Sequence, residues 1–586
     1  MKTTLLRIFD EMAAITHSHH LMQSRIILIL ALALCWTVGA NAQTPTDTNQ
    51  LPQTDTNQLQ TTGTNQIQQT ATNQMQQAGA GTNQPAPPDT NLVQAAQVPS
   101  APARKERIVS LQDCLQFALQ HNLDIQIQRY NPVISQFTLD VSYDTYEPVF
   151  TFTAGKQYNS SPGALITDTN GNVVRVSGNQ IESDNYTPAI NGVLPTGLTY
   201  NLDGTWTRES IWNQPANGGG YWLPPDWSAG PGITLQQPLL RNFWIDQNRL
   251  TIQVNKVALQ TSEQALRLQI MTTVFSVESA YYTLLFDRGN VDANVTALQL
   301  AQQLAANNKK QVEIGTLAPL DEKQAEAQAA ASLAALQAAR QALIIQENTL
   351  KNLITDDYMQ WVDISPKPAE QLVAVPQVLD RQTSWRRALA ERPELLEAQL
   401  NVKKQGITLK YNLNQLFPEL DVTGSYGRNA FDSDFGQTFA DISRGDNTFY
   451  SYGAIFSMPL AGNLAARNNY KSGKVTLKQL LLQLKQEEQT ILVAVDNDVG
   501  QVQSTLEQVN STHAARLYAE DALKAEQTKL ENGKSTSFNV LQLISNLTTA
   551  RVNEIQALAN YNIAVAQLSL DQGSTLEDNK IDLKLK

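Results

Sequence analysis

The sequence of 586 residues contains two cysteines, Cys35 and Cys114, and five histidines. Cys35 lies in an apolar N-terminal segment that we expect to be cleaved, which leaves one thiol. A single thiol excludes an intramolecular disulfide and a cysteine-based metal cluster. The two histidines expected after cleavage, His121 and His513, lie outside any HExxH-like spacing, which argues against a catalytic metal site. No catalytic constellation is found, so the sequence predicts neither an enzyme nor a cofactor.

Basic residues are also scarce, with 43 Lys and Arg against 55 Asp and Glu. A nucleic-acid partner is not expected, because binding phosphates requires a basic face. The chain is longer than a domain built around a single hydrophobic core, so several structural units or an elongated form are expected.

The N-terminus has the features of a secretory signal. Arg25 precedes an apolar run over residues 26–34, and Ala40-Asn41-Ala42 fits a small-x-small cleavage site. The run is too short to span a bilayer as a helix. We therefore predict a signal peptide over residues 1–42, with Met22 as an alternative start. Lipidation of Cys35 is the weaker alternative, because a bulky leucine precedes it.

Residues 43–104 form a low-complexity segment in which Thr-Asn-Gln recurs, followed by a Pro/Ala-rich run. So few apolar side chains cannot offset the entropy lost on ordering. We predict a disordered tether.

The remaining chain contains an internal repeat, in which the same order of predicted helices and strands occurs twice. Ala118 and Pro148 are 30 positions apart, as are Ala388 and Pro418, and a strand-like run follows each proline. Further matches occur in the same order, which indicates a duplication. The predicted units are a first repeat over 105–365, a linker over 366–381, a second repeat over 382–572 and a polar tail over 573–586.

Long helices are predicted where proline is nearly absent and apolar residues recur at helical spacing. The expected long helices cover 242–312 and 464–530, the return helices 319–354 and 536–571, and the helices before the strands 110–145 and 382–416. At about 1.5 Å per residue, one return helix and one strand-entering helix together match one long helix. Each repeat therefore predicts antiparallel coiled-coil rods.

The strand-like runs alternate apolar and polar residues, as in a transmembrane barrel strand, although a half-buried strand of a soluble sheet has the same pattern. The predicted lipid-facing residues are Phe150, Phe152, Leu420, Val422, Tyr426, Tyr450, Tyr452 and Phe456. The prolines at the predicted strand–helix corners are Pro148, Pro238, Pro418 and Pro459.

Because both ends of each strand pair meet helices on one side, the number of crossings per repeat must be even. Two per repeat gives four per chain, fewer than a closed barrel needs, and open edges are not tolerated in lipid. The chain is therefore expected to oligomerise. The alternating stretch from Leu198 to Trp206 is expected to form an external strand or rim, since a fifth crossing would break the parity.

The duplicated plan resembles the TolC-like outer-membrane efflux proteins. The resemblance rests on SLQDCLQFALQHN, the Tyr-Glu-Pro and Phe-Pro steps before the strands, the LQQPLLRNF corner, and the turns EIGTLAPLDEKQA and ENGKSTSFNVLQ. It covers residues 105 to 572. It implies a homotrimer with a 12-stranded barrel in outer-membrane lipid and a helical tunnel in the periplasm of a Gram-negative-type bacterium.

The resemblance further implies a passive exit duct of a tripartite efflux or type I secretion system. Its partners would be a periplasmic adaptor (membrane fusion) protein and an inner-membrane RND, ABC or MFS transporter. The adaptor-contact tip would comprise Gly315, Thr316, Leu317, Gly533, Lys534 and Ser535. Members of the family narrow the channel with two aspartates after the second turn; here Asn539 and Gln542 match those positions, and Asp321 follows the first turn.

Two other functions fit the same pattern. The first is a trimeric coiled-coil rod, anchored in the outer membrane, with a structural or adhesive role and no transport. The second is a soluble coiled-coil scaffold. Pore formation would distinguish the duct from the rod, and solubility without detergent would support the scaffold.

Overall fold

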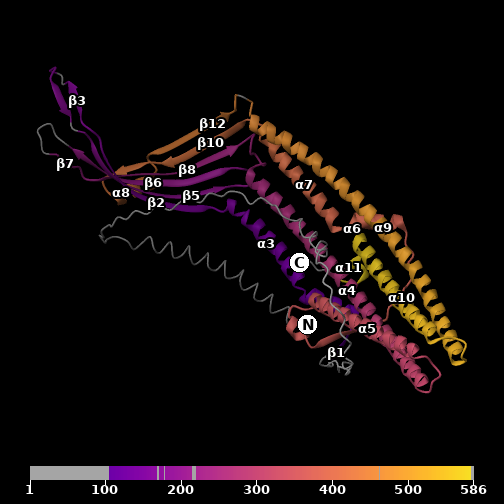
Figure 1. Ribbon diagram of the computed structural model, residues 1–586. Coiled ribbons are helices and arrows are strands. Elements are labelled where there is room, and N and C mark those ends of the chain that lie inside the picture. The colour runs from indigo at the N-terminus through magenta and orange to yellow at the C-terminus, as the bar shows by residue number, and fades with distance from the viewer. Residues whose placement is uncertain (1–104, 168–169, 177, 214–219, 461, 582–586) are drawn as a thin grey trace, which may run out of the picture. The chain divides into compact units, whose positions relative to one another are not determined.

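The computed structural model describes residues 105–581, apart from 168–169, 177, 214–219 and 461 (Figure 1). The predicted signal peptide, Cys35 and the predicted tether over 43–104 lie outside the described residues, as does the end of the predicted tail over 582–586. None of the helices in the described part combines the length and the apolar character that a membrane-spanning helix requires.

Four long helices dominate the helical part. They are α4 (Gln247–Glu313), α5 (Pro319–Ile354), α9 (Leu464–Glu531) and α10 (Ser537–Gln572). Their positions confirm the predicted long and return helices to within a few residues. Asp246 caps the start of α4 by accepting a hydrogen bond from the Arg249 amide, and Asn463 caps α9 in the same way through the Ala466 amide.

Two shorter helices precede the strands in each half, where the sequence predicted one. They are α2 (Leu111–His121) and α3 (Leu123–Val141), then α6 (Arg381–Glu391) and α7 (Pro393–Asn414). The prediction of continuous helices over 110–145 and 382–416 is therefore wrong. Asn122 has extended backbone and caps α3 through the Ile125 amide. Arg392 is extended because the following residue, Pro393, disfavours the helical conformation before it.

The lengths of these helices match as predicted. The 67 residues of α4 span about 100 Å, the 36 residues of α5 about 54 Å, and α2 with α3 cover about the remainder. Helix α4 packs against α5 along one part of its length and against α2 and α3 along the other; α9 packs in the same way against α10, α6 and α7. Each half is therefore an antiparallel helical rod.

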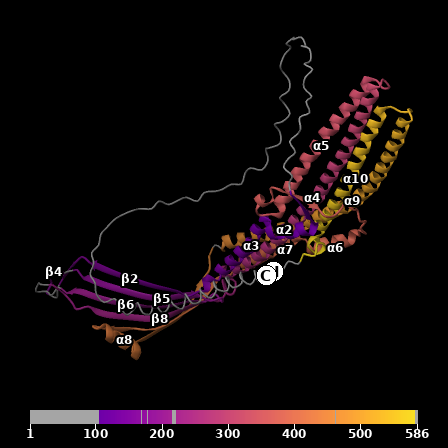
Figure 2. The same cartoon turned by 90° about the horizontal axis from the view of Figure 1, so that it is seen from below.

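Three hydrophobic clusters hold the helices. One surrounds Tyr281 and Met271 of α4 and includes Leu115 of α2 and Leu350 of α5. A second forms the matching core of the other half, between α6, α7, α9 and α10. The third joins the halves, since it combines residues of α4, α9 and α10. Figures 1 and 2 show these helices side by side up to their turns.

Several short elements were not predicted. Strands β1 (Lys105–Val109) and β9 (Ile364–Pro368) pair in parallel, and β9 takes up the first part of the predicted linker over 366–381. Helix α11 (Thr575–Asp578) lies in the predicted polar tail, and its Leu576 joins the first core. Two 3₁₀ turns, η1 (Asp144–Tyr146) and η2 (Tyr358–Trp361), complete the helical part.

Six long strands form one antiparallel sheet. They are β2 (Val149–Ser160), β5 (Gln180–Val193), β6 (Thr199–Asn213), β8 (Asp226–Pro238), β10 (Glu419–Arg428) and β12 (Thr448–Ser457). Their order is β12-β10-β8-β6-β5-β2, so β12 and β2 are the edges (Figure 1). Helix α4 follows β8 and helix α9 follows β12.

The sequence predicted four membrane-crossing strands per chain, whereas this sheet contains six long strands. The first half supplies four and the second half two. The stretch from Leu198 to Trp206, expected as an external strand or rim, runs into β6, which lies within the sheet between β5 and β8. The expectation considered β6 alone, which would have made the number of strands in the first repeat odd. Because β5 pairs with β6, two strands are added and the number stays even.

Small elements extend the sheet at the end away from the helices (Figure 1). They are the hairpin β3 (Ala164–Thr167) and β4 (Val173–Val176), strand β7 (Tyr221–Trp222) on β6, strand β11 (Ala430–Asp432) on β8, and helix α8 (Phe435–Arg444).

Candidate channel wall, corners and tip

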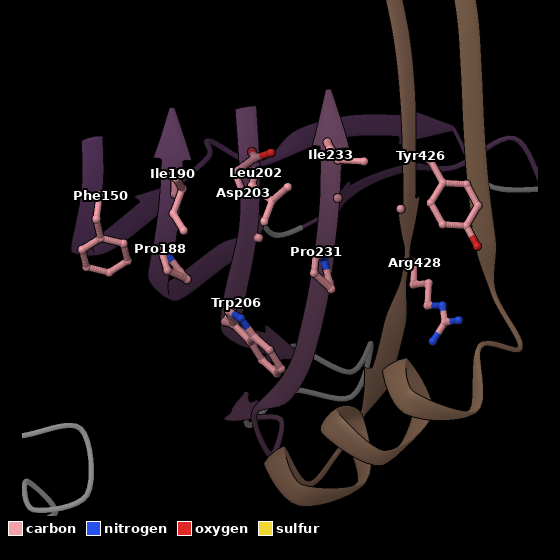
Figure 3. A pocket seen from close by; sticks show the side chains of 14 residues that line it. Phe150, Pro188, Ile190, Leu202, Asp203, Trp206, Pro231, Ile233, Tyr426 and Arg428 are labelled. Carbon is pink, nitrogen blue, oxygen red and sulfur yellow. The ribbon is translucent and has the colours of Figure 1, made fainter. Parts of the chain in front are cut away.

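One face of the sheet is apolar from edge to edge. Residues directly opposite one another in antiparallel strands point to the same face. The register places six such residues in one row across the sheet: Phe150, Ile190, Leu202, Ile233, Tyr426 and Tyr450. Figure 3 shows the first five of them side by side. Because side chains alternate along a strand, all eight predicted lipid-facing residues lie on this same face.

The apolar face is exposed in the single chain. Tyr450 and Tyr452 are 74% and 85% exposed, and every residue of β2 and of β12 is exposed. A large exposed apolar surface on a folded chain marks contact with a partner or a membrane. The face is hollowed by a groove of about 520 Å³, which Phe150, Trp206 and Tyr426 help to line.

The opposite face is polar and linked by side-chain hydrogen bonds. The Ser425 and Ser451 hydroxyls are 2.6 Å apart, and Thr207 donates to Asn185 Oδ1 at 2.8 Å. Gln236 donates to Asp421 Oδ2 at 2.6 Å. Small hydroxyl and amide side chains of this kind suit the wall of a water-filled channel.

Aromatic residues gather at the end of the sheet away from the helices. Trp206 lies 5.4 Å from Phe435 and 5.9 Å from Phe439, measured between ring centroids, and both phenylalanines belong to α8. Arg428 fixes the end of this helix by donating to the Ile442 carbonyl at 2.8 Å. Aromatic side chains with polar neighbours favour the boundary between hydrocarbon and water.

The two strand–helix corners are held by the end of α7. Asn242 and Asn463 both have positive φ, 66° and 48°, which asparagine tolerates better than most residues. The Asn242 amide donates to Asn414 Oδ1 at 2.7 Å, and Gln415 donates to Asn242 Oδ1 at 2.8 Å. Asn463 in turn donates to the Gln415 carbonyl at 3.1 Å. One helix end therefore contacts both corners.

The four predicted corner prolines lie at strand ends. Pro148 and Pro418 come immediately before β2 and β10, Pro238 is the last residue of β8, and Pro459 follows β12. Proline lacks an amide donor, so the end of a strand is where it costs the ladder least.

The predicted tip residues form two helix-ending turns. Gly315 and Gly533 have φ of 79° and 68°, and nothing lies within 4 Å of where their Cβ atoms would be. The next residue in each turn, Thr316 and Lys534, donates its amide to a carbonyl five residues earlier. In the first turn, Leu317 is half-buried. In the second turn, the Ser535 hydroxyl donates a hydrogen bond to the Glu526 carboxylate at 2.5 Å.

The residues of the predicted constriction lie on two helices. Asn539 and Gln542 are exposed on α10, three positions apart on one face, and Gln542 donates to Asn546. Asp321 lies on α5 and accepts, through its backbone carbonyl, a hydrogen bond of 3.2 Å from Asn308. Within the described residues, no hydrogen bond joins Asp321 to Asn539 or Gln542.

Asn308 was missed by sequence analysis. It is 1% exposed on α4, and Ser537 at the start of α10 donates to its Oδ1 at 3.0 Å. A single asparagine within a long helical pattern gives no signal of burial, because its partners come from α5 and α10. Asn308 of α4 therefore links the start of α5 to the start of α10, close to the turns at Gly315 and Gly533.

Several buried or half-buried carboxyl groups in the helical part, among them Glu278, Asp287 and Asp498, have raised pKa values. Burial raises the pKa of Glu278 to about 7, although Asn579 donates a hydrogen bond to it at 3.0 Å. Burial, and then the neighbouring Asp571, raise the pKa of Asp498. Arg392 lies 3.1 Å from Asp571 and keeps that carboxylate paired. Within the described residues no cluster of His, Cys, Asp and Glu could hold a metal ion.

Comparisons with known proteins agree with this architecture. Residues 385–573 match the family model described as outer membrane efflux protein. The outer membrane efflux protein BepC of Brucella suis biovar 1 (strain 1330) is 24% identical over 357 residues, which cover 58% of this chain and 70% of BepC.

Solved structures share the fold at low sequence identity. The CmeC outer membrane channel of Campylobacter jejuni has a TM-score of 0.57 at 13% identity, over 81% of this chain and 90% of CmeC. The outer membrane protein VceC of Vibrio cholerae has a TM-score of 0.56 at 15% identity, over 79% of this chain and 96% of VceC.

The family match and the shared fold confirm the predicted location in the outer membrane, with the helices in the periplasm. Residues 385–573 form an outer membrane efflux protein domain, and the predicted resemblance of this chain to the TolC-like outer-membrane efflux proteins is confirmed.

Proposed function

We propose that the chain is a passive exit duct, in which three copies join their sheets into one barrel and their helices into a periplasmic tunnel. The observation that carries this proposal is the combination of one apolar face, one polar face and two unpaired edges, β2 and β12. Unpaired amides and carbonyls are not tolerated in hydrocarbon, so edge strands at membrane depth must pair with another copy.

The tips are the proposed docking surface for a periplasmic adaptor. Gly315, Gly533 and Lys534 are exposed at the ends of the two helical turns, where a partner can reach them. An inner-membrane pump of the RND, ABC or MFS class would supply the energy, since the duct itself only needs to conduct. Asp321, Asn539 and Gln542 are the proposed constriction near these tips.

Planar-bilayer recording of the purified full chain tests the duct. We expect discrete conductance steps, together with a trimeric mass in detergent. A trimer that inserts without conducting would instead support the structural or adhesive rod. A monomer that stays in aqueous buffer would support the soluble scaffold and overturn the proposal.

Adaptor docking needs its own test. A photoreactive cross-linker on Lys534→Cys is expected to capture an adaptor in the native host, whereas the same probe on Val475→Cys, exposed on α9 near the sheet, is not. Equal capture at both positions would contradict docking at the tip.

A further inference from the structure

The hairpin β5–β6 is built into the middle of the first half's sheet. β5 pairs with β2 from Val149 to Ser160, and β6 pairs with β8 from Thr199 to Glu209. Strands β2 and β8 are therefore separated by two strands and do not pair with each other. Moving the hairpin outside the membrane would leave β8 and β2 with open edges there, which hydrocarbon does not tolerate.

The turn of this hairpin lies at the helix end of the sheet. Gln237, beside the first corner, donates to the Thr196 carbonyl at 3.1 Å, and Arg249 of α4 donates to the Pro195 carbonyl at 3.1 Å. Gly197 in the turn has φ of 86° and packs against Pro238. The hairpin thus starts and ends at the far side of the sheet and turns at the helix side.

The apolar face continues across the hairpin without a charged residue. On β6 it presents Tyr200, Leu202, Gly204 and Trp206, and on β5 Gly192, Ile190, Pro188 and Tyr186. Charged residues follow in the next row, where Arg208 pairs with Asp184 at 3.1 Å. The uncharged positions 186 to 192 on this face span about 20 Å along the strand, compared with an apolar band of about 25 Å on membrane barrels.

The other face of the hairpin continues the polar wall. Thr187 and Thr205 have hydroxyls 3.1 Å apart, and Thr207 donates to Asn185. The alternation on β5 and β6 is therefore the same as on β8 and β10, and Figure 3 shows Ile190 and Leu202 beside Ile233 on one side.

We propose that β5 and β6 cross the membrane and that lipid acyl chains cover their apolar face, so each chain contributes six strands. This inference rests on the proposed trimeric barrel. Three copies then close eighteen strands in place of the predicted twelve, which widens the barrel from about 24 Å to about 36 Å in diameter at a strand spacing of about 4.8 Å and a tilt of about 40°. A barrel of this width would admit bulkier cargo than a twelve-stranded one.

Spin labels in the full chain, reconstituted in liposomes, test this placement. Single cysteines are introduced by Ile190→Cys and Leu202→Cys on the hairpin, Ile233→Cys on β8 and Thr205→Cys on the polar face, in a Cys114→Ala background. We expect labels at 190 and 202 to collide with oxygen several-fold more than with a water-soluble nickel chelate, as at 233. The label at 205 is expected to show the reverse.

Two outcomes would overturn the inference, and they are distinguishable. If 190 and 202 are open to the nickel chelate while 233 is not, the hairpin lies outside the bilayer and the proposed duct still stands. If 233 is also open to the chelate, the sheet is not in lipid, and the duct and the six-strand wall both fail.

Discussion

Gly315 and Gly533 end the two longest helices with the same turn. In each, the glycine has positive φ, and the following amide donates to a carbonyl five residues earlier, at 2.9 Å for Thr316 and 2.8 Å for Lys534. This arrangement satisfies the last carbonyls of the helix and reverses the chain. The two halves therefore present matching turns at the proposed docking surface.

The first prediction concerns this glycine. Gly533→Ala is expected to destabilise the turn by about 1 kcal/mol, because an L side chain is strained in the left-handed region. Hydrogen exchange of the amides around Gly533 should accelerate about fivefold. Gly500→Ala is the control: Gly500 lies within α9 with open space around it, and alanine there should stabilise the helix by about 0.5–1 kcal/mol. Equal effects at the two positions would contradict the role of the turn.

The second prediction concerns the contact between the two helical turns. Asn308→Leu removes the acceptor of Ser537 and the donor to the Asp321 carbonyl. Leaving such buried groups without partners costs about 1–3 kcal/mol. We expect faster hydrogen exchange at the starts of α5 and α10, with no change around the first core. The Ser537→Ala variant, which removes one hydrogen bond of the two, should have the smaller effect.

The third prediction is a pH dependence at Glu278. Its folded-state pKa is raised from 4.5 to about 7, so the stability it contributes is fully present below about pH 4.5 and is lost as the pH rises through about 7. Glu278→Gln keeps an acceptor for Asn579 without the charge. The variant should therefore match the wild type at pH 4.5 and exceed it at pH 8, by up to about 3 kcal/mol.

Thermal unfolding at the two pH values checks this prediction. Glu313→Gln, on the exposed end of the same helix, is the control and should leave the pH dependence unchanged. A Glu278→Gln variant that loses stability between pH 4.5 and 8 as the wild type does would contradict the assignment.

The fourth prediction concerns ion selectivity. Asn539 and Gln542 share one exposed face near the tip, and both are uncharged. Replacing both by aspartate places carboxylates at the proposed constriction, which should attract cations. Reversal potentials in a salt gradient are expected to shift toward cation selectivity. The same double change at Asn546 and Thr549, further along α10, should produce a smaller shift; an equal shift would move the constriction away from the tip.

The helices could be predicted well because the sequence signals them locally. Proline is nearly absent from α4, α5, α9 and α10, and apolar side chains recur at helical spacing. The break at Asn122 could not be predicted, since asparagine occurs both within helices and at caps. Its role depends on packing against the Leu353 carbonyl, 3.0 Å from its amide nitrogen.

Strand β5 was missed for a physical reason. Pro188 lies in its middle, and proline within an apolar–polar run normally argues against a central strand. The ladder with β6 does skip Thr187 and Pro188, but it resumes at Ala189 in the same register. Without β5, strand β6 had no partner and was assigned to the rim. The buried pair Asn308 and Ser537 was missed because it joins residues far apart in the chain.

The placement of the β5–β6 turn beside the first corner has a wider consequence. A hairpin leaves and returns on one side, so it is the smallest addition to the wall that leaves α3 and α4 in place. In the proposed six-strand wall, the hairpin therefore adds to the circumference of the barrel without any change in the lengths of α4 and α9. In this architecture, the width of the barrel in lipid and the length of the helices across the periplasm can therefore be set independently.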